Sequence, residues 1–215
     1  MKILIADDHA MVREGLRHIL AREWPAAEFG EARSAPEVMQ LLHRETWDVL
    51  ILDISLPERS GLEVLQDIKR EHPKLPVLIL TIHSEEQYAV RALRAGAAGY
   101  LTKDSAGSEL VEAAHKVLAG GHYVSAALGE RLAGALAGEN DRPRHEQLSN
   151  REFATLCGIA SGKTVTEIAA QLSLSVKTVS SYRARLLQKM GMRTNAELTH
   201  YAIRNRLVNG NHHTP

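Results

Sequence analysis

The sequence predicts an α/β domain, with a five-stranded parallel sheet covered by helices on both faces, followed by a smaller all-α domain. Three observations support this prediction. Short apolar runs alternate with helix-length segments over the first 120 residues, no strand-like run follows residue 148, and the charge changes sign between the two parts. At 215 residues the chain is long enough for two domains.

Four apolar runs and one more polar run account for the five strands. The apolar runs are nearly continuous and rich in branched side chains, which is typical of strands buried on both faces. They are ILIA at 3–6, VLIL at 49–52, VLIL at 77–80 and the weaker GYL at 99–101. The run EFGEAR at 28–33 has the polarity of an edge strand.

Helix start signals lie between these runs. A capping box pairs Ser or Thr with Glu or Gln three residues later. This spacing occurs at Ser34 with Glu37, Ser60 with Glu63, and Ser84 with Gln87. Strand and helix therefore alternate, as in an open parallel sheet whose ligands bind beyond the carboxyl ends of the strands.

The pattern changes after residue 120. Residues 120–138 can form one amphipathic helix, and the polar, proline-containing ENDRPRHEQ after them is expected to be an interdomain linker. Beyond Leu148, further start signals predict four short helices. They are Ser149 with Glu152, Thr164 with Glu167, Thr194 with Glu197, and an N-cap at Ser175. The polar tail at 209–215 is expected to be disordered.

The zero net charge of the chain hides a division between its halves. Residues 1–118 hold 14 Lys and Arg against 19 Asp and Glu, whereas residues 143–215 hold 10 against 4. A basic second half indicates contact with a polyanion such as a nucleic acid.

Cysteine usage and hydropathy bear on the compartment. Cys157 is the single cysteine, so an intrachain disulfide is excluded, and it is expected to be a buried, unreactive thiol. No stretch approaches the ~20 apolar residues of a membrane span. We therefore expect a cytoplasmic protein without a membrane partner.

Polar residues follow the ends of several expected strands. They are Asp7, Asp8, Asp53, Thr81 and Lys103. The three carboxylates would repel one another unless a cation lay among them, and Mg²⁺, or Mn²⁺ in its place, suits such an oxygen-rich site. Each residue alone could be a loop cap or a surface polar group, but all five in register with strand ends favour a shared site.

This set of residues suits phosphoryl transfer. With a metal held by Asp7, Asp8 and Asp53, a carboxylate oxygen of Asp53 can attack a phosphoryl group and form an acyl phosphate. The metal would neutralise charge on the transferring oxygens, while the Thr81 hydroxyl and the Lys103 ammonium hold the others. His9 and His83 are expected to line the rim.

Residues 1–120 resemble the receiver domain of bacterial two-component response regulators. The resemblance rests on DDH at 7–9, on LDISLP at 52–57 with a glycine eight residues after its aspartate, on the threonine at 81, and on GYLTK at 99–103. It implies a sheet of strand order 2-1-3-4-5. Many receivers follow the lysine with proline, whereas this chain has Asp104.

The resemblance also implies a role for each residue of the site. Asp53 would be the phosphoacceptor, and Asp7, Asp8, Asp53 and the backbone carbonyl of Ser55 would hold the metal. Thr81 and Tyr100 would be the switch pair, in which the hydroxyl is drawn toward the phosphoryl group and the ring turns inward behind it.

A helix-turn-helix is expected at residues 166–190, as a short helix, a tight turn at 173–175 and a longer helix. On the longer helix Val176, Val179, Leu186 and Met190 recur at helical spacing and should face inward, with Leu187 beside them. Small residues and cations on the other side can enter the major groove, unless that side is simply a solvated face. The expected DNA-contacting residues are Lys177, Thr178, Ser180, Ser181, Arg183, Ala184, Arg185, Gln188 and Lys189, of which Arg183 and Lys189 are assigned to phosphates.

Residues 148–208 resemble the four-helix LuxR-type DNA-binding domain. The resemblance rests on LSNRE, SGKTVTEIAAQLSLSVKTV and KMGMRTNAEL. Joined to a receiver, such a domain is similar to the NarL/FixJ class of response regulators. The expected organisation is a receiver at 1–120, a linker with a helix at 121–147, the DNA-binding domain at 148–208 and a tail at 209–215. Family members often carry Lys at 180 and His at 182, where this chain has Ser180 and Tyr182, so no operator sequence is carried over.

The two resemblances imply a phosphorylation-controlled transcription regulator and not an enzyme. A sensor histidine kinase would phosphorylate Asp53, and the added charge of about −1.5 to −2 would shift the receiver between two arrangements. Double-stranded DNA and a second copy of the chain are the expected partners, with RNA polymerase as a possible further one.

Two alternatives stay open. A metal-dependent phosphohydrolase also uses an aspartate nucleophile, but it needs a second carboxylate two residues later, where this chain has Ser55. In the other, control is independent of phosphorylation and the receiver serves as a dimerisation surface.

Overall fold

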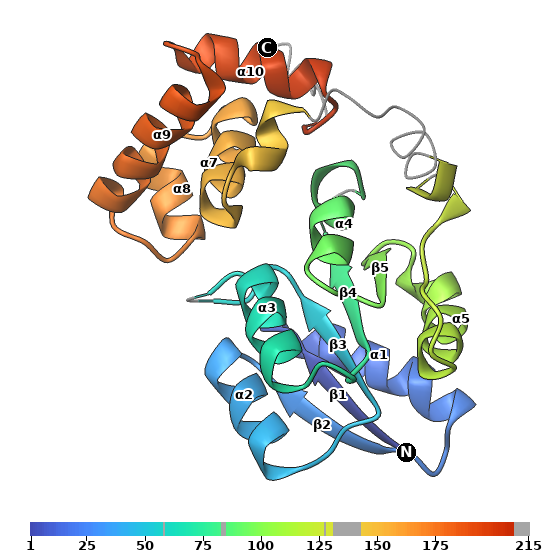
Figure 1. Cartoon of the computed structure of the whole chain (residues 1–215). Coiled ribbons are helices and arrows are strands. Elements are labelled where there is room, and N and C mark those ends of the chain that lie inside the picture. The colour runs from blue at the N-terminus through green and yellow to red at the C-terminus, as the bar shows by residue number, and fades with distance from the viewer. Residues whose placement is uncertain (58, 83–84, 127, 131–142, 209–215) are drawn as a thin grey trace. The chain divides into compact units, whose positions relative to one another are not determined.

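The chain forms two compact units, Met1–Ala137 and Gly138–Pro215. The computed structural model describes all residues except 58, 83–84, 127, 131–142 and 209–215 (Figure 1). Among the described residues no helix has both the length and the apolar character to cross a membrane.

The first unit is a five-stranded parallel sheet in the order β2-β1-β3-β4-β5, which confirms the predicted fold. The strands are β1 (Lys2–Ala6), β2 (Glu28–Ala32), β3 (Val49–Asp53), β4 (Val77–Thr81) and β5 (Gly99–Thr102). The helices are α1 (Ala10–Glu23), α2 (Ala35–Arg44), α3 (Gly61–Glu71), α4 (Glu85–Arg94) and α5 (Ala106–Leu118).

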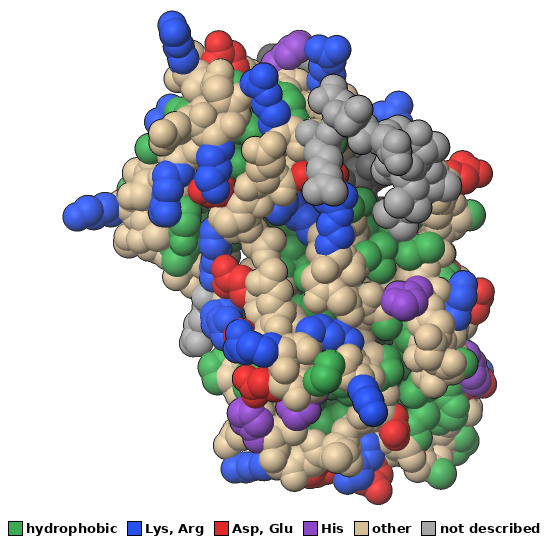
Figure 2. Space-filling view, in the orientation of Figure 1, with side chains coloured by type: hydrophobic (Ala, Val, Ile, Leu, Met, Phe, Trp, Pro, Cys, Tyr) green, Lys and Arg blue, Asp and Glu red, His purple; other side chains and the backbone are tan. Residues whose placement is uncertain are grey.

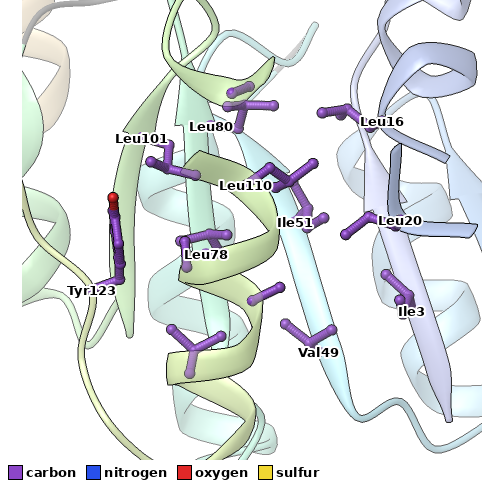
Figure 3. Close-up of a cluster of buried hydrophobic side chains, with 14 of the residues drawn as sticks. Ile3, Leu16, Leu20, Val49, Ile51, Leu78, Leu80, Leu101, Leu110 and Tyr123 are labelled. Atoms are coloured by element: carbon purple, nitrogen blue, oxygen red, sulfur yellow. The ribbon is translucent and has the colours of Figure 1, made fainter. Parts of the chain in front are cut away.

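Helices α1 and α5 cover one face of this sheet. Alternate strand residues such as Ile3, Ile51 and Leu78 point to this face and pack against Leu20 of α1 and Leu110 of α5 (Figure 3). All of them are buried. The central strands are buried along their whole length, which explains why their sequences are continuous apolar runs.

Helix starts in this unit follow the predicted caps in part. The Ser34 hydroxyl accepts a hydrogen bond from the Glu37 amide, but the Glu37 carboxylate accepts from the Arg33 amide and not from Ser34, so only half of the predicted capping box forms. The Ser60 hydroxyl accepts one from the Leu62 amide, not from Glu63, so Ser60 is an N-cap without the predicted capping box. The box expected at Ser84 lies outside the described residues.

The prediction of a helix at residues 120–138 is wrong for its first residues, because residues 121–125 are not helical. Tyr123 is extended and pairs with Gly99. The Tyr123 amide donates to the Ala98 carbonyl at 2.9 Å, and the Tyr100 amide donates to the Tyr123 carbonyl at 3.2 Å. These bonds satisfy backbone groups that the edge strand β5 would otherwise leave unpaired. The Tyr123 side chain joins the core, so the first unit extends past the expected boundary at residue 120.

The second unit contains the four predicted helices. They are α7 (Asn150–Ala160), α8 (Val165–Gln171), α9 (Val176–Met190) and α10 (Asn195–Arg204). The capping boxes at Ser149, Thr164 and Thr194 are confirmed, and the Ser175 hydroxyl accepts from the Thr178 amide. A short 3-10 helix, η1 (Arg144–Gln147), occupies part of the expected linker, while the tail at 209–215 lies outside the described residues.

The inward face of α9 differs from the prediction at one residue. Val179, Leu186 and Met190 are fully buried, as expected, and Leu187 is half-buried. Val176 is 48% exposed. It is the first residue after the N-cap, so it lies at the end of the helix and not over the core that covers the later turns.

Candidate functional site

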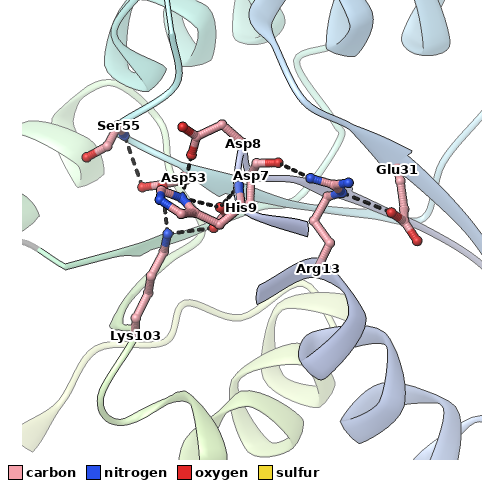
Figure 4. A network of polar contacts seen from close by, with 8 residues as sticks. All are labelled: Asp7, Asp8, His9, Arg13, Glu31, Asp53, Ser55 and Lys103. Atoms are coloured by element: carbon pink, nitrogen blue, oxygen red, sulfur yellow. Dashed lines mark hydrogen bonds and ion pairs between the residues drawn. The ribbon is translucent and has the colours of Figure 1, made fainter. Parts of the chain in front are cut away.

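The carboxyl ends of β1, β3 and β5 bring Asp7, Asp53 and Lys103 together (Figure 4). Lys103 Nζ lies 2.8 Å from Asp53 Oδ2 and 2.6 Å from Asp7 Oδ2. Both carboxylates are almost fully buried, at 2% and 1% exposure. The parallel register places these strand ends at one edge, so residues distant in sequence share one site.

Backbone amides fix the orientation of both carboxylates. The Ser55 amide donates to Asp53 Oδ1 at 3.0 Å, and the His9 amide donates to Asp7 Oδ1 at 2.8 Å. Each carboxylate therefore has one oxygen on a backbone amide and the other toward Lys103.

Burial and the shared ammonium act against each other on the pKa values of this site. Burial raises the pKa of the Asp53 carboxyl, and the hydrogen bonds from Lys103 and the Ser55 amide only partly offset it. Burial also acts to lower the pKa of Lys103, but its contacts with Asp53 and Asp7 outweigh this and raise the pKa above its ordinary value. The Lys103 ammonium therefore forms ion pairs with both the Asp7 and the Asp53 carboxylate.

Asp8 lies at the open side of the site. Its side chain is 36% exposed, and its Oδ1 lies 2.6 Å from His9 Nδ1. The same ring nitrogen lies 3.3 Å from Asp7 Oδ1. His9, whose side chain is 67% exposed, therefore lines the rim as expected, whereas His83 lies outside the described residues.

The donor set fits a hard divalent cation. Asp7 Oδ2 is buried and has no hydrogen-bond partner among the described residues, since its 2.6 Å contact with Lys103 is an ion pair without hydrogen-bond geometry. Oxygens of Asp7 and Asp53 converge there, and Asp8 stands beside them at the rim. Carboxylate oxygens are the ligands that Mg²⁺ prefers.

The remaining predicted residues lie around this centre. Thr81 ends β4, is fully buried, and its carbonyl accepts from the Lys103 amide at 2.8 Å. Tyr100 on β5 is also fully buried, so its ring is turned inward. Ser55 is exposed and lies two residues after Asp53, in the β3–α3 loop.

Arg13 belongs to the site, although it was missed by the sequence reasoning. This residue of α1 is only 4% exposed; its Nη1 donates to the Asp7 carbonyl at 2.8 Å and its Nε to Glu31 Oε2 at 2.9 Å. It thereby ties the Asp7–Asp8 turn to α1 and to β2 (Figure 4). The signal in the sequence was a charged residue at a helix position whose spacing to Leu16 and Leu20 places it on the buried face.

Gly61 is the glycine that the receiver resemblance includes. A Cβ at this residue would lie 2.2 Å from the Asp53 carbonyl oxygen and 2.7 Å from the Ile54 Cα. The start of α3 thus packs directly on the backbone of the candidate phosphoacceptor, which only glycine permits.

The expected DNA-contacting side of α9 is a largely exposed surface. Lys177, Ser180, Ser181, Ala184, Arg185, Gln188 and Lys189 are exposed, and Thr178 and Arg183 are half-buried. The Arg185 guanidinium lies over the Tyr182 ring, 5.0 Å from its centroid.

Both residues that are predicted to contact DNA phosphates form hydrogen bonds within the protein. Lys189 Nζ donates to Glu152 Oε2 at 2.7 Å, and Arg183 Nε donates to Asn195 Oδ1 at 2.7 Å. Burial acts to raise the pKa of Glu152, but the bonds from Lys189 and Ser149 outweigh it, and the pKa falls below its ordinary value. Lys189 therefore has a role in holding α9 on α7, and its contact with DNA stays a prediction.

An acidic strand-end site with a shared lysine, joined to a helix-turn-helix unit, defines a DNA-binding response regulator. The model of the response regulator receiver domain matches residues 3–115, and that of the bacterial regulatory proteins of the luxR family matches residues 146–202. The chain belongs to the response regulators of the NarL/FixJ class, which are transcription regulators of two-component systems and not enzymes.

Full-length relatives support this assignment. The chain is 35% identical over 210 residues to "Response regulator UvrY" of Escherichia coli strain K12, covering 97% of this chain and 96% of UvrY. It is 33% identical over 210 residues to "Response regulator GacA" of Pseudomonas aeruginosa, covering 97% and 98% of the two chains.

Solved structures of another response regulator, RcsB, are similar to this chain. RcsB from Salmonella enterica serovar Typhimurium, bound to the promoter rprA in the presence of the phosphomimetic BeF3−, is 30% identical with a TM-score of 0.65 and covers 94% of this chain and 97% of its own. A structure of two RcsB dimers bound to two parallel DNAs is 28% identical with a TM-score of 0.59, covering 97% and 99%.

Proposed function

We propose that Asp53 is the residue that accepts the phosphoryl group from a sensor histidine kinase. The proposal rests on the position and the hydrogen bonds of the Asp53 carboxylate. It is buried at the carboxyl edge of the sheet, with Oδ1 on the Ser55 amide and Oδ2 on Lys103. In this transfer a carboxylate oxygen of Asp53 attacks phosphorus, the bond from phosphorus to the phosphohistidine nitrogen breaks, and the histidine leaves with the bonding electrons.

Asp7, Asp8, Asp53 and the Ser55 carbonyl would hold Mg²⁺, or Mn²⁺ in its place. Bound there, the cation offsets the negative charge of the phosphoryl oxygens. Lys103 provides a second positive charge, because its ammonium can pass from Asp53 Oδ2 to a phosphoryl oxygen. Thr81 and Tyr100 would form the switch pair that senses the new charge.

The output of the protein is proposed to be DNA binding by a homodimer in the cytoplasm. The exposed side of α9 would enter the major groove, with Lys177 and Arg185 as its exposed cations that have no salt bridge among the interactions described, whereas Arg183 is half-buried and bonded to Asn195. The related RcsB is seen as dimers bound to DNA, which supports the same assembly here. RNA polymerase is a further proposed partner.

Treatment of the full chain with acetyl phosphate and Mg²⁺ tests the proposal. Intact-mass measurement should show the gain of one phosphoryl group in the wild type and in Asp104→Asn, which changes an exposed carboxylate beside Lys103. Asp53→Asn and chelator-treated wild type should show none. A phosphoryl group on Asp53→Asn would refute the assignment.

The same samples separate the alternatives. A phosphohydrolase would release phosphate steadily from small substrates, whereas a response regulator should accumulate as the phosphoprotein. The sequence already disfavours hydrolysis, because Ser55 stands where the general acid is needed. If DNA affinity is unchanged by the phosphodonor and by Asp53→Asn, control is independent of phosphorylation.

A further inference from the structure

We propose that His43, Glu71 and His72 form a binding site for a divalent transition metal of the Zn²⁺ type, outside the phosphorylation site. Each of the three residues offers one ligand atom, and these atoms all lie within 4.8 Å of one another. His43 lies in the last turn of α2, Glu71 ends α3, and His72 is the C-cap of α3.

The site lies at the edge of the sheet opposite to Asp53. Helices that connect parallel strands run back across the sheet, so their C-terminal ends lie near the amino ends of the strands. Asp53 ends β3, whereas His43 and Glu71 lie at the ends of α2 and α3. Figure 2 shows histidine side chains at the surface in the region of these two helices.

An unpaired buried nitrogen is the observation that points to a ligand. His72 Nε2 is buried and has no hydrogen-bond partner among the described residues. Leaving such a buried polar atom unpaired is unfavourable. The His72 backbone is fixed, because its amide donates to the Ile68 carbonyl at 2.6 Å and its carbonyl accepts from the Leu75 amide at 3.1 Å. A bound metal ion would give this nitrogen a partner without moving the helix end.

The donor set selects the metal. Two imidazoles and one carboxylate form the ligand set of zinc sites that keep one position open, and imidazole is a poor ligand for Mg²⁺. Metal–ligand bonds of about 2.0–2.1 Å in a tetrahedron place ligand atoms about 3.3 Å apart. His43 Nε2 and Glu71 Oε2 are 2.9 Å apart, and the ring centroids of His43 and His72 are 6.3 Å apart.

Small side-chain rotations suffice to close the site. The side chains of His43 and Glu71 are 60% and 38% exposed, so both can turn. Arg70 does not block them: its Nη2 lies 3.8 Å from Glu71 Oε1 and is held by Asp67 Oδ1 at 2.8 Å. Glu71 Oε2 stays directed toward His43. A metal here would join the ends of α2 and α3 and stabilise the first unit.

Zn²⁺ titration of the full chain by calorimetry tests this proposal. The acidic site is first saturated with Mg²⁺, and His212 and His213 of the tail are replaced with Ala in every sample. We expect one Zn²⁺ per chain, and binding at least about tenfold weaker in His43→Ala, as for loss of one ligand. The matched control is His18→Ala, which removes an exposed histidine of α1 and should bind as the parent does.

A second readout covers the buried ligand. Co²⁺ added in place of Zn²⁺ should give a visible absorption band that is lost in His43→Ala and in His72→Gln, while the melting temperature rises with metal only in the parent and in His18→Ala. If His72→Gln fails to fold, the exposed His43→Ala and Glu71→Gln variants decide the matter. Equal Zn²⁺ affinity in the parent and in His43→Ala would overturn the proposal, as would binding that requires the tail histidines.

Discussion

Lys103 Nζ lies 2.8 Å from Asp53 Oδ2, although 50 residues separate the two in the chain. The ammonium therefore holds one of the carboxylate oxygens through which Asp53 would attack phosphorus. It also contacts Asp7, so a single cation balances two buried carboxylates. In the unphosphorylated site, burial disfavours the charged carboxylates and the Lys103 ammonium favours them. Removing the ammonium or changing the charge of either carboxylate should therefore change the stability of the first unit.

Lys103→Met should destabilise the first unit by about 3 kcal/mol at neutral pH, because it leaves two buried carboxylates without their shared partner. Urea unfolding measures the loss. Saturating Mg²⁺ should restore a large part of it, since the cation replaces the missing charge. Lys74→Met removes an exposed lysine and is the control, with little change expected. If the two variants lose the same stability, Lys103 does not balance the site.

The pKa of Asp53 predicts a dependence of stability on pH. Burial raises this pKa in the folded chain, so the stabilising contribution of Asp53 is fully present below the ordinary carboxyl pKa and is lost as the pH rises through the raised value. Asp53→Asn cannot titrate. In metal-free buffer its unfolding free energy, relative to wild type, should therefore increase as the pH rises above the ordinary carboxyl pKa of about 3.9. Urea curves at several pH values measure this difference, and a constant difference would contradict the prediction.

Arg13→Met should loosen the Asp7–Asp8 turn, because the Asp7 carbonyl loses its buried hydrogen bond and Glu31 loses its partner. We expect Mg²⁺ affinity to fall by about tenfold, as for loss of a group that orients metal ligands. Calorimetry with Mg²⁺ measures it. Arg17→Met, at an exposed position of the same helix, should leave the affinity unchanged. Wild-type affinity in Arg13→Met would show that the turn is held by other contacts.

Gly61→Ala should displace the start of α3 from Asp53, since the new methyl group would overlap backbone atoms of Asp53 and Ile54. We expect a loss of stability of about 2 kcal/mol or more and slower phosphorylation by acetyl phosphate. Gly107→Ala is a matched control in α5, where a Cβ meets nothing within 4 Å and should stabilise the helix by about 0.5–1 kcal/mol. Equal effects of the two substitutions would rule out a steric requirement at Gly61.

Substitutions on α9 should separate DNA contacts from structural ones. Lys177→Gln and Arg185→Gln should each weaken binding to duplex DNA and lower the slope of log affinity against log salt by about one. Lys189→Gln should mainly lower the stability of the second unit, because it leaves Glu152 buried without its cation. Fluorescence anisotropy at several salt concentrations, with urea unfolding, measures both. An unchanged salt slope in Lys177→Gln and Arg185→Gln would place the DNA elsewhere.

The strands, most helix starts and the chemistry at the strand ends can be predicted from the amino-acid sequence alone. These features are local: a buried parallel strand must be apolar throughout, a capping box needs residues three apart, and a doubly wound sheet brings its carboxyl ends to one edge. Asp7, Asp53, Thr81 and Lys103 could therefore be named before any contact was known. The predictions are wrong at Ser60, which forms no capping box, and at Val176, which is exposed. Both residues lie at a helix start, where the local geometry of the first turn determines which amide is capped and which side chain is buried.

Which residues distant in sequence come into contact depends on how the helices and strands pack. Tyr123 falls within a predicted helix, yet it extends along β5, because the exposed edge of a strand offers backbone partners that no periodicity reveals. Arg13 reaches the Asp7 carbonyl, and His43 meets Glu71, only because α1, α2 and α3 pack at particular angles on the sheet. Hydrogen bonds and ion pairs between elements act over a few ångströms, so they depend on packing that the spacing of residues along the chain does not encode.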